Sequence, residues 1–146
     1  MIGITENGVT YYNFTLSAVN SYLREQFKNI ELIISDDNFQ YAVFRYNNCF
    51  CKIDVCAMYH IVLTYNESEK SKIQPIIDCI KKWDFCKSKN GFIVEWKMSN
   101  PIEHVLNHYA HLDHCTMICT GFHQKEYYIK HYDSCSITWA ERGYPI

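Results

Sequence analysis

The sequence predicts an α+β fold, a mainly antiparallel sheet with about three helices packed on it. Apolar residues recur every three or four positions in two segments, a helix-start signature opens a third, and alternating runs separated by short turns fill the stretches between them. The order of helices and strands does not follow a regular β-α alternation. At 146 residues, the chain has the length of one domain, and we expect a single globular domain over residues 1–146.

The first predicted helix covers residues 15–28. Leu16, Val19 and Leu23 form its apolar stripe, and Thr15 is placed to accept a backbone hydrogen bond as the N-cap. A second stripe runs through Ile73, Ile76, Ile77, Ile80 and Trp83, with Pro75 expected in the first turn of that helix.

The run between these two helices predicts an antiparallel meander. Asp36-Asp37-Asn38 is typical of a turn, and Asn47-Asn48 can adopt the positive φ of a tight hairpin. The predicted strands are Ile30–Ser35, Phe39–Tyr46, Cys49–Cys56 and, after a break near Ala57, His60–Tyr65.

The third helix has the clearest start signal. Asn100 suits the N-cap, Pro101 the first helical position and Glu103 the third, so we expect a helix from Asn100 to Asp113. The strands predicted around it are Phe92–Met98, Cys115–Thr120, Glu126–Tyr132 and Cys135–Ala140.

Three histidines, His104, His108 and His111, stand at helical spacing in that third helix, opposite its apolar side. Imidazoles one turn apart can chelate zinc, although Val105 occupies the position where a zinc protease carries its glutamate. The alternative to a metal site is that the three histidines simply face solvent or contact a partner protein. We expect no cofactor, and zinc is the alternative.

Composition excludes several classes of function. The net charge of -2 gives no positive field for a phosphate backbone, so we expect neither nucleic acid nor a membrane as partner. The eight cysteines include no Cys-x-x-Cys pair, and no signal peptide precedes them, which favours reduced thiols and a cytoplasmic location. A cysteine nucleophile would need His60 or His123 as its base.

Aromatic and acidic residues indicate a protein-binding surface. Tyrosine and tryptophan are common interface anchors, and carboxylates attract a basic partner such as a toxin or nuclease. The candidate partner-binding residues are Asp36, Asp37, Glu67, Glu69, Tyr127, Tyr128, Tyr132 and Trp139. We therefore expect a small cytosolic inhibitor, such as a toxin-neutralising immunity protein or a phage-encoded inhibitor, that occludes the active site of its partner.

Two other functions fit the same sequence. A metal-binding protein or enzyme would use the histidine face of the third helix. A secretion-type chaperone has similar size and charge, and would form a stable homodimer with an exposed apolar strand.

Overall fold

A computed structural model of the chain describes the backbone of residues 2–6, 9–13, 15–56, 60–83, 92–105, 108–119 and 136–139. Side chains are described for residues 15–55, 60–83, 93–98 and 112–119. The fold is α+β, with two α-helices and one large antiparallel sheet in the described part of the chain.

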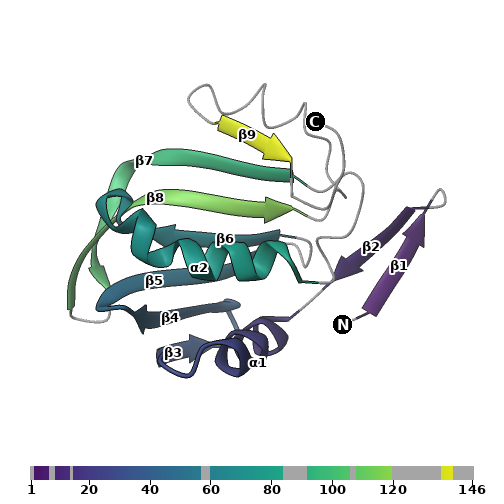
Figure 1. Cartoon of the computed structure of the whole chain (residues 1–146), viewed down its shortest axis with the longest axis horizontal. Coiled ribbons are helices and arrows are strands. Elements are labelled where there is room, and N and C mark those ends of the chain that lie inside the picture. The colour runs from purple at the N-terminus through teal and green to yellow at the C-terminus, as the bar shows by residue number, and fades with distance from the viewer. Residues whose placement is uncertain are drawn as a thin grey trace.

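Seven strands form the large sheet in the order β3-β4-β5-β6-β8-β7-β9, and every neighbouring pair is antiparallel (Figure 1). Their bounds are β3 Glu31–Asp36, β4 Tyr41–Tyr46, β5 Cys49–Cys56, β6 His60–Tyr65, β7 Phe92–Val105, β8 His108–Cys119 and β9 Ser136–Trp139. A separate hairpin of β1 (Ile2–Glu6) and β2 (Val9–Asn13), not predicted from the sequence, precedes the first helix.

Helices α1 (Leu16–Gln26) and α2 (Lys70–Lys81) pack against the same face of the sheet (Figure 1). Thr15 caps α1 as predicted, and its Oγ1 accepts a hydrogen bond from the amide of Ala18 at 3.2 Å. A 3-10 turn, η1 (Glu67–Glu69), leads into α2, so Pro75 falls in the second turn of α2 and not in its first turn. None of the described helices is long and apolar enough to cross a membrane.

The main core lies between the two helices and the sheet. Alternation along each strand turns one set of apolar side chains toward the helices, and their burial stabilises the fold. The buried core residues from the helices are Leu16, Val19, Leu23, Ile73, Ile76, Ile77 and Ile80. Those from the strands are Ala42, Phe44, Tyr46, Cys49, Cys51, Ile53, Val55, Ile61, Leu63, Tyr65, Ile93 and Ile118.

The meander from β3 to β6 confirms the predicted strands, except that Phe39 and Gln40 belong to the turn before β4. Asn47 and Asn48 adopt positive φ angles of 51° and 61°, as the tight turn between β4 and β5 requires. Of the later strands, β9 confirms part of Cys135–Ala140, whereas residues 57–59 and 126–132 lie outside the described residues.

The predicted third helix is wrong, because residues 100–105 belong to β7 and residues 108–113 belong to β8. Ile102 pairs with Leu112, and His104 pairs with Tyr109. The register shifts between Lys97 and Ile102, so Pro101 stands in an interrupted part of the ladder, where its missing N–H removes no regular hydrogen bond. Pairing with a neighbouring strand therefore overrides the local capping signal.

The hairpin extends past the end of β6 and bends across the sheet face that carries no helix among the described elements (Figure 1). Leu112 of β8 packs there against Val43 of β4, and both side chains are buried. Val94, Met117 and Cys119 form a further buried cluster on that face. The sheet is therefore apolar on both faces.

Candidate functional site

The structure places the four predicted acidic residues at opposite ends of the sheet. Asp36 is the last residue of β3 and Asp37 begins the turn that follows, whereas Glu67 and Glu69 lie in η1. The side-chain amide of Asn47, in the turn at the far end of β4, donates to the backbone carbonyl of Lys72 near the start of α2 at 3.4 Å. These carboxylates therefore do not form one steering surface.

The predicted aromatic anchors fall mainly outside the described part. Tyr127, Tyr128 and Tyr132 belong to residues that the structure does not describe. Trp139 lies on β9, the outermost of the described strands on that side of the sheet, where its backbone pairs with Phe92. The aromatic interface predicted from these residues stays a prediction.

The three histidines lie on the two strands of the β7–β8 hairpin. His104 is on β7, whereas His108 and His111 are on β8, and Val105 pairs with His108. The helical spacing that would align them as a zinc chelate does not exist here. Their side chains are not described, and the described side chains elsewhere form no group of three or more metal-ligating residues.

His60 and Cys119 are brought together by the sheet, because they are direct partners in the register of β6 and β8. Both are buried, with exposed fractions of 6% and 0%. A thiol nucleophile must reach its substrate, so this burial disfavours a catalytic cysteine at this position. The alternative base, His123, lies outside the described residues.

The turn between β3 and β4 is held rigidly by its own polar groups. Asp36 Oδ1 accepts hydrogen bonds from the amides of Asn38 at 2.9 Å and Phe39 at 3.1 Å. The carboxylate of Asp36, predicted to attract a basic partner, therefore forms an Asx turn with its own backbone. Asp37 remains exposed as the acidic side chain of the turn.

Gln40 ties the same turn to the rest of the molecule. Its φ is 52°, an uncommon value for a residue other than glycine. Its side-chain Oε1 accepts from the amide of Leu16 at 3.1 Å, and its backbone carbonyl accepts from the amide of Val55 at 2.9 Å. The turn is thus fixed to the start of α1 and to β5.

Phe39 projects from this turn and is 77% exposed, the one exposed large hydrophobic side chain among those described. The sequence pattern predicts Phe39 inside a strand, and its exposure on a turn was therefore not expected. The signal that could have found it is the run Asp36-Asp37-Asn38, whose turn chemistry continues directly into an aromatic residue. An exposed aromatic on a rigid turn is a suitable anchor for a partner protein.

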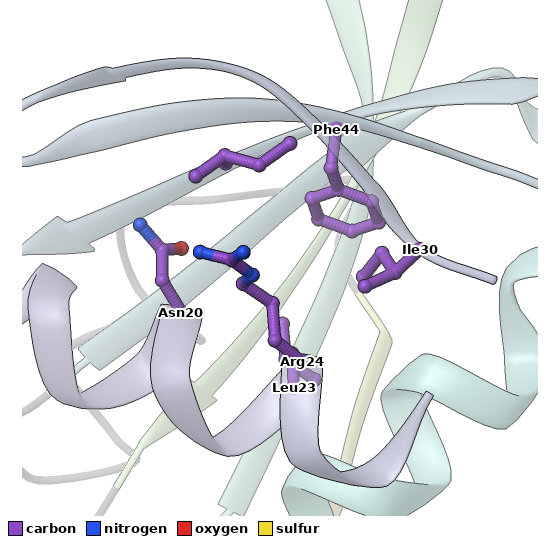
Figure 2. Close-up of a pocket in the computed structure, with 6 residues that line it drawn as sticks. Asn20, Leu23, Arg24, Ile30 and Phe44 are labelled. Carbon is purple, nitrogen blue, oxygen red and sulfur yellow. The ribbon is translucent and has the colours of Figure 1, made fainter. Parts of the chain in front are cut away.

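A small pocket lies between α1 and the start of the sheet (Figure 2). Leu23, Ile30, Leu32 and Phe44 provide its apolar lining, and its cavity volume of about 10 Å³ has room for about one water molecule. The side chains of Asn20 and Arg24 reach from α1 toward the strands at the pocket (Figure 2). We call this surface, comprising α1, β3 and the turn 37–40, the α1–β3 edge.

The α1–β3 edge therefore offers an exposed aromatic, an exposed carboxylate and an apolar pocket with a guanidinium at its rim. This combination can bind another protein, and it holds no arrangement of nucleophile, base and oxyanion donors. The chain has no significant match among protein-family models, curated proteins or solved structures.

Proposed function

We propose that this protein is a small protein-binding inhibitor that covers the active site of its partner, as toxin-neutralising immunity proteins do. The observation that carries the proposal is Phe39, which is 77% exposed on a turn fixed by hydrogen bonds. Burying such a side chain stabilises a complex by roughly 1.5–3 kcal/mol. A cytoplasmic location is part of this proposal.

Preorganisation of the turn supports the proposal. A flexible loop loses conformational freedom when it binds, and this loss reduces the affinity of the complex. Here Asp36 and Gln40 already hold the backbone around Phe39. The anchor therefore binds with little additional ordering of the chain.

The negative charge of Asp37 indicates which type of partner this surface would bind. Its carboxylate is exposed within two residues of Phe39. A negative charge beside an aromatic anchor favours a partner with a basic patch around an apolar pocket. A nuclease or other toxin with positive charge around its substrate site would offer a basic patch of this kind.

Calorimetric titration against a purified partner tests this function, beginning with the product of the neighbouring reading frame. Inhibition should saturate at one copy per partner. We expect Phe39→Ala to weaken binding by about 2 kcal/mol, roughly 30-fold, because the anchor is lost. Phe39→Tyr keeps the ring and should bind nearly as tightly as the wild type.

Asp37→Lys provides a second measurement on the same complex. It should slow association, most strongly at low salt, because it reverses the charge beside the anchor. Full inhibition by a correctly folded Phe39→Ala variant, with unchanged affinity, would overturn the proposed site.

A further inference from the structure

β3 is the outermost of the described strands on its side of the large sheet (Figure 1). It pairs with β4 on one side, and no described strand pairs with it on the other. The backbone N–H and C=O groups along such an edge can bond to a strand of another chain. The open side of β3 is therefore a place where a second chain can bind.

The composition of β3 does little to prevent this pairing. Residues 32–34, Leu-Ile-Ile, form an apolar run at its centre, and all three are half-buried. Edge strands are commonly protected by lysine or proline, and the β3 sequence Glu-Leu-Ile-Ile-Ser-Asp contains neither.

A bulge at Ile33 limits the backbone ladder that β3 can form. The register with β4 passes from Leu32 opposite Phe44 to Ile34 opposite Val43, which leaves Ile33 as the extra residue. A second strand can therefore form only a short ladder here. However, Ile33 belongs to none of the apolar clusters formed by the described side chains. Its side chain is available to a second chain and adds an apolar contact to the short ladder.

The two ends of this edge carry opposite charges. Lys28, shortly before β3, and Asp37, directly after it, are exposed, and neither forms an ion pair with another described side chain. The charges on β3 itself are already engaged, because Glu31 binds Arg45 and Asp36 accepts hydrogen bonds from its own turn. The edge thus has a basic end and an acidic end.

We propose that β3 pairs in the antiparallel direction with β3 of a second copy of this chain, across a two-fold axis at Ile33. Residue 29 of one copy then lies opposite residue 37 of the other, so Lys28 approaches Asp37 of the second copy. The two-fold symmetry repeats this contact at both ends. A parallel arrangement would instead place like charges together. The edge is therefore complementary to itself, which identifies a second copy as its occupant.

Sedimentation equilibrium of the full chain tests the proposal, and should show a monomer–dimer equilibrium as the concentration rises. Ile33→Lys places two like charges at the centre of the contact and should abolish the dimer. Ser71→Lys adds the same charge on the exposed side of α2, away from β3, and should leave the dimer unchanged. Circular dichroism shows whether each variant is folded.

Charge reversal tests the antiparallel direction with exposed residues, whose replacement does not depend on the core. Lys28→Glu alone or Asp37→Lys alone should weaken the dimer about tenfold at low salt, because two symmetry-related ion pairs are lost. The double variant restores opposite charges and should recover most of this affinity. High salt should reduce all these differences.

Amide hydrogen exchange locates the contact, since the β3 amides should exchange more slowly as the dimer forms. A chain that remains monomeric at roughly 1 mM, a dimer that survives in Ile33→Lys, or a double variant that binds no more tightly than either single variant would overturn the inference. All these measurements use the protein alone. Their outcome is therefore independent of the proposed function, which needs a different partner.

Discussion

Asp54 shows how burial and charge compete at a single residue. Its side chain lies on the face of the sheet away from α1 and α2, with Oδ1 3.7 Å from Lys52 Nζ. The ammonium group also lies 5.0 Å from the centre of the Tyr41 ring. Burial raises the pKa of Asp54 and outweighs the opposing attraction to Lys52. The charged carboxylate is therefore less favourable here than in the unfolded chain.

We expect Asp54→Asn to increase the free energy of unfolding at neutral pH, because the amide has no charge to desolvate. The folded pKa lies above the unfolded value of 3.8, so the stability from this group is present below pH 3.8 and is lost as the pH rises through the folded pKa. Urea unfolding at neutral and acidic pH measures both effects. Glu25→Gln, on the exposed side of α1, is the matched control for loss of a carboxylate. Lower stability of Asp54→Asn at neutral pH would contradict this account.

At the scale of elements, the helices and the meander could be predicted because their signals are local. Thr15 caps α1, and Asn47 with Asn48 forms the tight turn, each within a few residues of the pattern that identifies it. The signal at Asn100-Pro101 is equally local, but pairing with β8 decides the structure there. Such pairing depends on residues that are distant in the sequence and adjacent in the sheet. A local spacing pattern contains no information about them.

The same reason limits prediction of the candidate site. Asp36, Asp37 and the turn were identified from residue type, because turn chemistry is local. The pocket was not identified, because it joins Leu23 on α1 to Phe44 on β4, and no short motif contains both. The exposure of Phe39 likewise depends on where the chain turns relative to the core.

We expect the bent β7–β8 hairpin to depend on the contact between Leu112 and Val43. Leu112→Ala should reduce the free energy of unfolding by about 2–5 kcal/mol, as for other buried leucines. Leu112→Met nearly conserves the volume and should cost less than about 1.5 kcal/mol. A double-mutant cycle with Val43→Ala, measured by urea unfolding, should show coupling of at least about 0.5 kcal/mol. Additive effects of the two changes would contradict the contact.

At the scale of the whole molecule, two thiols and one phenol on the side of the sheet that faces the helices have raised pKa values because they are buried. Burial, with a smaller contribution from Glu69, raises the pKa of Cys49 to about 11. Burial also raises the pKa of Cys51 and of Tyr65, whose hydroxyl lies 2.6 Å from Thr116 Oγ1. These groups keep their protons in the folded state at pH values where the unfolded chain releases them.

Stability should therefore fall in alkaline solution. The stability linked to Cys49 is fully present below its unfolded pKa of 9.0 and is lost as the pH rises to about 11. Urea unfolding midpoints across this range measure the loss, with the free thiols protected from oxidation by reductant. Cys49→Ala should show a shallower decline than the wild type. A constant midpoint over the range would contradict the assignment.

The position of β8 between β6 and β7 has a consequence for the order of folding. β6 and β7 are parallel and are connected through α2, but they do not pair with each other. Each of them pairs with β8, which follows both in the chain and lies between them in the sheet. The meander from β3 to β6 joins strands that are adjacent in the chain, so its loops close quickly. β7 pairs with no strand of the meander, and its backbone ladder on that side is formed with β8. We therefore expect the meander to nucleate folding, and the β7–β8 hairpin to dock onto it as a preformed unit.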